Sequence, residues 1–155
     1  MSFSNIKIIL ACSALIVGLQ GCANSSIDWA HSKVLSTLPA SLQGSTVAIY
    51  PLDKDKAGKI ETVAIQNHIT TELNKMGVKS VNPRQEVPTY FVLFDYANEL
   101  GIAANYEQVF LLITYSSTNP PQQVYKAKLS IDSKNNNTVE NINNAVTTLF
   151  NRAPK

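Results

Sequence analysis

Two stretches of the sequence are apolar on both faces of an extended chain, and they constrain the fold more than any other feature. They span residues 89–96 (TYFVLFDY) and 106–115 (YEQVFLLITY). Successive side chains of a β-strand point to opposite faces of the sheet. A strand that is hydrophobic in both directions is typical of the interior of a covered sheet. The two stretches therefore predict the interior strands of a sheet at the centre of the molecule.

Two further segments have strand patterns. The β-rich segment 46–50 precedes a proline and a charged turn, and it predicts the first strand. Segment 123–131 alternates cleanly between apolar and polar residues, and it predicts the last strand. The sequence thus predicts four strands.

A helix is expected over residues 59–76, where one apolar stripe recurs at helical spacing. Gly77 is placed to take the left-handed position after the helix end, and Val78 can then touch Leu73, as in a Schellman motif. Residues 138–151 predict a second helix, with Asn137 as its N-cap and Glu140 as the matching partner.

A third helix is expected over residues 27–38, because Ile27, Ala30, Val34 and Leu38 fit a helical period and Pro39 follows them. Residues 22–44 would then form a tether with a short N-terminal helix, and residues 45–155 the folded domain.

The order of elements predicts an α+β fold: a two-layer sandwich with a mixed, mostly antiparallel four-stranded sheet and helices packed on one face. The first strand, helix and second strand should form a right-handed crossover between parallel strands. The later strands should form an antiparallel meander, because the links between them are short.

The first 22 residues have a different character. Residues 1–7 carry one charge, Lys7, and an uncharged run of 12 residues follows from Ile8 to Leu19. A helix needs about 20 apolar residues to span a bilayer, so this run is too short for that purpose and is typical of a secretory leader. Residues 1–21 are therefore expected to be a signal peptide.

The leader ends in Leu19-Gln20-Gly21-Cys22, which resembles the lipobox of bacterial lipoproteins. The resemblance implies cleavage between Gly21 and Cys22 and acylation of Cys22, so that the N-terminal lipid holds the protein on a membrane. The alternative is an ordinary signal peptide with an incidental cysteine. Ala23 stands where an aspartate would resemble an inner-membrane retention signal, so the expected location is the periplasmic face of the outer membrane.

Cysteine use agrees with this interpretation. Cys12 lies in the leader and Cys22 in the lipobox, and residues 23–155 contain no cysteine. The mature domain therefore has no disulfide, no thiol nucleophile and no thiolate metal site, although it is expected in an oxidising compartment.

The later motifs follow one another as Leu73 to Gly77, Tyr90–Tyr96, Leu111–Ile113, Val124–Ala127 and a last helix near Phe150 and Pro154. This order resembles a family of small bacterial outer-membrane lipoproteins catalogued as a domain of unknown function. The resemblance covers about residues 45–154 and implies no enzyme activity and no known ligand. The family opens with an extra strand and an aromatic-rich segment, and this chain departs from that pattern at residues 28–31 (DWAH).

A second resemblance concerns residues 47–52 (VAIYPL). They resemble the first strand of envelope lipoprotein cofactors that share the N-terminal domain fold of the Tol-system propeller protein. Some of those proteins regulate peptidoglycan synthases.

Few residues of the mature chain could act in catalysis or bind a metal. The two histidines, His31 and His68, are too few for a zinc site without cysteine, and no cofactor is expected. No serine-nucleophile motif or glycine-rich phosphate loop occurs in the mature chain. His68 is expected to be a helix residue that can pair with Glu72, and Asp95 to be an edge or surface carboxylate. Trp29 either packs or lies in the lipid interface.

These exclusions leave a non-catalytic role. A net charge of +2 gives no polycation for nucleic acid. We expect a lipid-anchored, periplasm-facing lipoprotein with a structural, assembly or partner-regulating role and an envelope protein partner. The alternative is a binding module for a small ligand or for peptidoglycan, and an enzyme is the least favoured class.

One surface is predicted to meet a partner. If the helices cover the faces with the longer apolar sets, then Phe91, Leu93, Phe110 and Leu112 share the opposite face with Lys126 and Lys128. Soluble monomers rarely leave such a patch bare. Either segment 27–38 folds over it, or a partner or second copy does.

Overall fold

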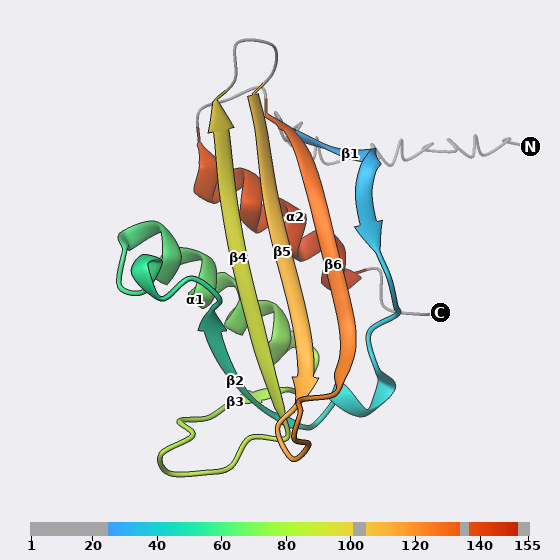
Figure 1. The fold of residues 1–155 in the computed structure, drawn as a ribbon, viewed down its shortest axis with the longest axis vertical. Helices are drawn as coiled ribbons and strands as arrows, with labels where there is room; N and C mark the ends of the chain where they lie inside the picture. Colours follow the sequence, from blue (N-terminus) through green and yellow to red (C-terminus); the bar gives the residue numbers. More distant parts are fainter. Residues whose placement is uncertain (1–24, 101–104, 134–136, 152–155) are drawn as a thin grey trace, which may run out of the picture.

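The computed structural model describes residues 25–100, 105–133 and 137–151. It contains a mixed sheet and two α-helices (Figure 1). The elements in chain order are β1 (Ser25–Val34), 3₁₀ helix η1 (Ala40–Leu42), β2 (Thr46–Pro51), 3₁₀ helix η2 (Lys54–Lys56), α1 (Ile60–Lys75), β3 (Lys79–Ser80), β4 (Tyr90–Leu100), β5 (Asn105–Tyr115), β6 (Gln123–Ser133) and α2 (Thr138–Asn151). Cys22 and the leader lie outside the described residues.

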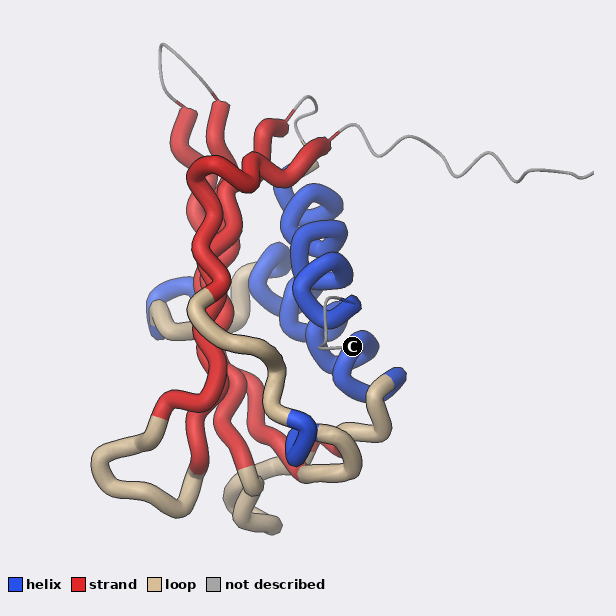
Figure 2. The backbone as a smooth tube through the Cα atoms, turned by 90° about the vertical axis from the view of Figure 1, so that its right-hand side faces the viewer, coloured by secondary structure: helices blue, strands red, loops and turns tan. Residues whose placement is uncertain are grey.

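The strands form one six-stranded sheet in the order β1-β6-β5-β4-β2-β3. β2 is parallel to β3 and β4, whereas β4, β5, β6 and β1 are successively antiparallel. Both helices lie on one side of the sheet (Figure 2). The predicted α+β class, parallel first pair and antiparallel meander are therefore confirmed, whereas the predicted number of four strands is wrong.

The helix predicted over residues 27–38 is also wrong, because this segment forms β1 and pairs with β6. Ile27 lies opposite Ile131, and it packs against the hydrophobic core from that position. Pairing with the free edge of β6 outweighs a helical spacing that a strand can also accommodate, because local propensity is weak against tertiary contacts.

The second unpredicted strand, β3, is two residues long and both are exposed. It pairs with β2 only at Thr46 and Val47. A strand this short has no alternation from which it could be predicted.

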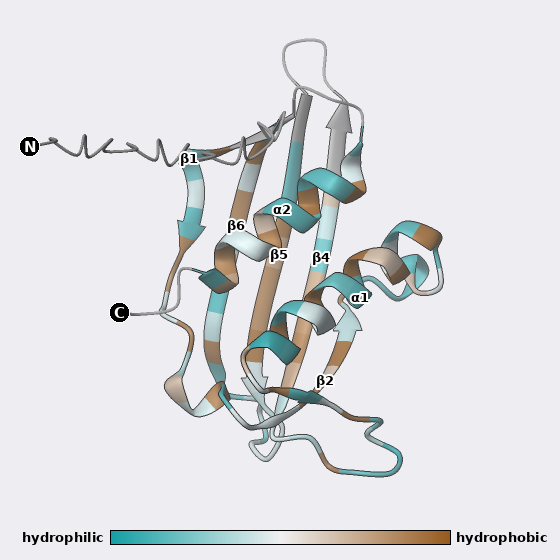
Figure 3. Cartoon of the chain, turned by 180° about the vertical axis from the view of Figure 1, so that it is seen from behind, coloured by the Kyte–Doolittle hydropathy of each residue, from teal (hydrophilic) through white to brown (hydrophobic). Residues whose placement is uncertain are grey.

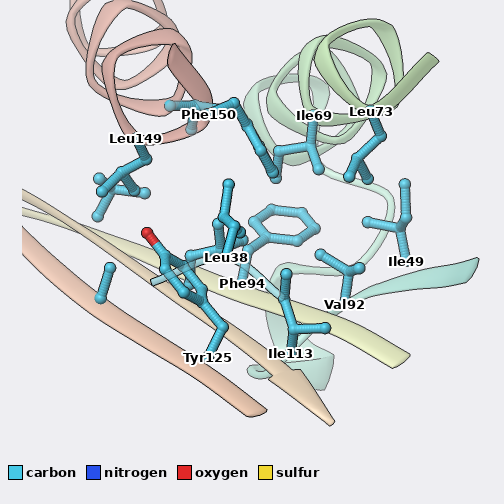
Figure 4. Close-up of a cluster of buried hydrophobic side chains, with 14 of the residues drawn as sticks. Leu38, Ile49, Ile69, Leu73, Val92, Phe94, Ile113, Tyr125, Leu149 and Phe150 are labelled. Atoms are coloured by element: carbon cyan, nitrogen blue, oxygen red, sulfur yellow. The ribbon is translucent and has the colours of Figure 1, made fainter. Parts of the chain in front are cut away.

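The core lies between the sheet and the two helices. Seen from behind, α1 and α2 cross in front of the sheet (Figure 3). Phe94 and Ile113 point from the sheet toward Ile69 and Leu73 of α1 and Phe150 of α2 (Figure 4). Leu38 and Leu42, from the segment between β1 and β2, are also buried in this core.

The helix ends form as predicted. The Val78 N–H donates to the Leu73 carbonyl at 3.1 Å and the Gly77 N–H to the Asn74 carbonyl at 2.9 Å, which is the Schellman pattern. Gly77 has a φ of 76°, a conformation that side chains with a Cβ disfavour. At the start of α2, Asn137 Oδ1 accepts the Glu140 N–H at 3.3 Å.

Candidate functional site

The sheet face opposite the helices carries the four predicted residues Phe91, Leu93, Phe110 and Leu112. Leu93 and Leu112 lie directly opposite each other on β4 and β5, and Asp95 lies opposite Phe110. Their strand neighbours of the other parity, such as Val92 and Phe94, are fully buried under the helices. The four side chains are only half-buried. We call this surface, with Tyr50, Lys126 and Lys128, the open face.

Tyr50 extends the open face across β2. It lies opposite Leu93 in the parallel register, and its ring is 6.3 Å from that of Phe91. It is 40% exposed, and the next residue of the same parity, Leu52, is 43% exposed. The apolar surface therefore spans three neighbouring strands.

The opposite margin of the open face is basic. Lys126 lies opposite Leu112, and Lys128 opposite Phe110. The Lys126 ammonium is 5.5 Å from the centre of the Phe110 ring. Lys33 of β1 lies opposite Lys128. Within the described parts of the chain, none of these three lysines forms an ion pair, so they offer uncompensated positive charge.

The one carboxylate of this region on β4 is already compensated. Lys56 donates to Asp95 Oδ1 and to the Tyr96 carbonyl, each at 2.6 Å. Its ammonium also lies 4.9 Å from the centre of the Tyr96 ring. The sequence predicts a charged turn here, and in the structure Lys56 fastens that turn to β4.

The segment predicted as a cover does not cover the open face. β1 lies in the sheet beside β6, and the following residues lead to Leu38 and Leu42 in the core on the helix side. No described element crosses in front of β4 and β5 (Figure 1). The prediction that segment 27–38 covers this face is therefore wrong.

The described residues enclose two small hollows of note. One, of about 80 Å³, is lined on the open face by residues that include Asp95, Phe110 and Lys128. The other, of about 120 Å³, lies between Leu38, Tyr125 and Leu149. Ligand pockets are usually about 300–1,000 Å³, so neither hollow supports a site that encloses a small molecule.

His68 belongs to a polar cluster between the two helices, which includes a residue that the sequence analysis missed. Its Nε2 is 2.8 Å from Thr147 Oγ1, and that hydroxyl donates to Glu72 Oε1 at 3.2 Å. Glu72 is buried and also accepts from Lys75 Nζ at 2.7 Å. Because the threonine hydrogen goes to the carboxylate, the imidazole is the donor to Thr147 and not its base. The cluster joins α1 to α2 and is not a nucleophilic site.

A second buried carboxylate, Glu107, was also missed. It is 2% exposed and lies under the first turn of α2, where the Thr138 hydroxyl donates to its Oε1 at 2.8 Å. A negative charge is favoured at a helix N-terminus. Its position among apolar alternating residues gave no sequence signal, because the contact depends on where α2 begins in space.

Membrane and metal features are few in the described residues. None of the helices there is long and apolar enough to cross a membrane. In those same segments, no group of three or more His, Cys, Asp or Glu side chains could hold a metal ion. His31 and His68 are on different elements, with separate carboxylate partners at Asp28 and Glu72.

Comparisons with known proteins show the fold alone. No protein-family profile and no curated protein sequence matches the chain. A PDZ domain protein from Parabacteroides distasonis is similar in structure, with a TM-score of 0.58 and 12% identity over 81% of this chain, which spans 35% of that protein. A PelC dodecamer from Paraburkholderia phytofirmans has a TM-score of 0.53 and 9% identity, over 84% of this chain and 99% of PelC. A point variant of the same PelC, also a dodecamer, has a TM-score of 0.50 and 14% identity, over 78% and 98%.

Proposed function

We propose that this chain is a lipid-anchored outer-membrane lipoprotein that faces the periplasm and has a non-catalytic structural or assembly role. The open face is the observation that carries the assembly role. Four large apolar side chains on β4 and β5 are left without a cover by the described residues, and a basic margin runs beside them. Soluble monomers rarely expose such a patch, and a patch of this kind marks an interaction site.

The anchor rests on the leader and its lipobox. β1 begins at Ser25, so only Ala23 and Asn24 separate the predicted lipidated cysteine from the first strand. Stable anchoring takes two acyl chains or more, which a lipidated N-terminal cysteine carries. The domain is then held directly against the membrane and is placed to work as a fixed subunit.

A second copy of this chain is the partner that the comparisons favour. The PelC structures are dodecamers, and this chain covers almost the whole of PelC. A subunit of this fold can therefore carry an interface within its own length. In the proposed contact, aromatic groups such as Tyr50 and Phe91 of one copy meet the lysines at the margin of the next, because cations favour the faces of aromatic rings.

The anchor is tested by replacing Cys22 with alanine in cells. The variant should accumulate as uncleaved precursor and incorporate no labelled palmitate, and the wild type should sediment with the outer membrane. Continued labelling of the variant, or a mature N-terminus other than Cys22, would refute the lipoprotein assignment.

The assembly role is tested by sedimentation of the mature domain. Leu112→Asp should convert a self-associated species into a monomer, because it places a charge in the middle of the open face. Val87→Asp is the matched control, since Val87 is 81% exposed and lies outside this face. A wild type that stays monomeric at high concentration would exclude the second copy as partner and leave a protein of another sequence to be sought by cross-linking from position 112.

A further inference from the structure

β1 is interrupted by a bulge that one side chain stabilises. Asp28 lies opposite Ser130 of β6, but Lys33 already lies opposite Lys128, so the intervening residues of β1 face a single β6 residue. Asp28 Oδ1 accepts the Ala30 N–H at 3.0 Å, and its Oδ2 lies 2.6 Å from His31 Nδ1. The Asp28 carbonyl also accepts the Ser32 hydroxyl at 2.6 Å. The bulge is thus an ordered feature of the edge strand.

The bulge presents the only tryptophan of the chain. Trp29 is 42% exposed. Next to it, the His31 side chain is 70% exposed but remains paired with Asp28. The two ionisable residues that flank Trp29 in this bulge, Asp28 and His31, are therefore paired with each other. An aromatic ring with a polar N–H beside a paired charge suits a boundary between water and an apolar layer.

The bulge also lies toward the end of the molecule where the lipid would enter. Ser25 follows Cys22 by three positions, and a fully extended chain of that length reaches about 11 Å. The first part of β1 crosses the upper end of the sheet, and the second part descends beside β6 (Figures 1 and 2). A bulge bends its strand, and this one lies where β1 changes direction.

We propose that the β1 bulge rests in the interfacial layer of the membrane, with Trp29 at the level of the lipid headgroups. The proposal rests on the lipid anchor at Cys22 that the proposed function assigns. Tryptophan is enriched at membrane interfaces, where its ring meets the acyl boundary and its N–H meets water. The lipid restrains the domain near the surface, and Trp29 then limits the orientations in which the domain can stand. The open face then points parallel to the membrane surface, toward neighbouring copies of this chain.

Trp29 itself can report on this contact. The chain from Cys22 to Lys155 has one cysteine and one tryptophan, so its thiol can be coupled to a maleimide lipid in phosphatidylcholine vesicles. We expect Trp29 emission to shift to shorter wavelength on coupling, and to be quenched when the vesicles contain brominated phosphatidylcholine. The uncoupled chain mixed with the same vesicles should show neither effect.

The double variant Trp29→Phe with Val87→Trp is the matched control. Val87 is 81% exposed and lies outside the open face, in the segment that leads into β4. The bulge faces Leu129 of β6, whereas the start of β4 is level with Gln123, six residues away and so about 20 Å along the strand direction. The control tryptophan should therefore keep its emission and escape quenching by the brominated lipid.

The outcomes separate this proposal from the proposed function. Quenching at position 29 and not at position 87 supports the docked bulge. Absence of quenching at position 29, or equal quenching at both positions, overturns it. A spectral shift without quenching also overturns it, because a protein contact and not lipid would then shield Trp29. These readings use a chemically coupled lipid, so they stand even if Cys22→Ala shows that cells do not acylate the chain.

Discussion

At the scale of single residues, Tyr90 shows how burial changes the chemistry of a side chain. It is 1% exposed, its ring stacks on that of Tyr115 at 4.8 Å, and its hydroxyl lies 2.6 Å from the Ser41 hydroxyl. Burial raises the pKa of Tyr90 above its ordinary value of 10.0, because the phenolate would lose its hydration. The folded domain therefore holds this proton more tightly than the unfolded chain does.

This difference predicts an alkaline loss of stability. Below pH 10 both states are protonated and the full stability is present. As the pH rises above 10, the unfolded chain loses the phenolic proton first, and stability falls until the folded-state pKa is passed. Urea unfolding on both sides of pH 10 should show this decline, and Tyr90→Phe should reduce it. Tyr50→Phe, at an exposed position, should leave the decline as in wild type; an equal effect of both variants would contradict the assignment to Tyr90.

Leu73 gives a second prediction at this scale. It is 1% exposed and lies between α1 and the sheet (Figure 4). Leu73→Ala should lower the free energy of unfolding by about 2–5 kcal/mol, since it removes buried contacts and leaves a cavity. Val63→Ala, on the exposed side of the same helix, should cost much less. Chemical denaturation of both variants measures the difference.

At the scale of secondary-structure elements, local patterns predicted most of the fold. The stripe of α1, the Asn137 cap of α2 and the two-sided strands β4 and β5 were readable because short-range spacing determines them. β1 was not, because Ile27, Val34 and Leu38 satisfy a helical spacing as well as a strand followed by a loop. What decides between them is the vacant edge of β6, which is about 100 residues away along the chain.

The contact between α1 and α2 could not be predicted for the same reason. His68 and Glu72 have a helical spacing, but their third partner, Thr147, is 79 residues from His68. Thr147→Val should destabilise the domain by about 1–3 kcal/mol, because the buried Glu72 loses a hydrogen bond. Thr148→Val is the control, since that hydroxyl donates to the Asn144 carbonyl of its own helix. Equal thermal unfolding of the two variants would show that the cluster does not join the helices.

At the scale of the whole molecule, the sequence predicted which residues form the open face but not what lies over it. Alternation along β4 and β5 separates Phe91 and Leu93 from Val92 and Phe94, so the membership of each face follows from the chain itself. Whether segment 27–38 covers that face depends on the order of strands in the sheet. As long as the place of β1 in the sheet is unknown, the apolar spacing of segment 27–38 fits a cover over the open face and an extra edge strand equally well.

The position of this segment predicts the effect of removing it. A chain that begins at Gly44 lacks β1 and also Leu38 and Leu42, which are 4% and 0% exposed in the core. It should unfold at lower denaturant and form larger assemblies than the wild type through the uncovered edge of β6, since unpaired edges template new strand pairs. The double variant Leu38→Ala with Leu42→Ala keeps β1, so it should be destabilised without self-association beyond that of the wild type. Denaturation and sedimentation measure the two effects, and a truncated chain as stable as the full domain would contradict the packing described here.

The pairing of β1 with β6 determines when the sheet can close in a chain that is exported N-terminus first. The Ser130 N–H donates to the Ser32 hydroxyl across this pair, and the two residues are 98 positions apart. β1 emerges early, yet it has no partner until nearly the whole domain has crossed the membrane. On the proposed export route, the stretch next to Cys22 is therefore still unpaired when the processing enzymes meet it. The late closure of the sheet therefore keeps β1, which follows the proposed cleavage site, free of sheet contacts until translocation is nearly complete.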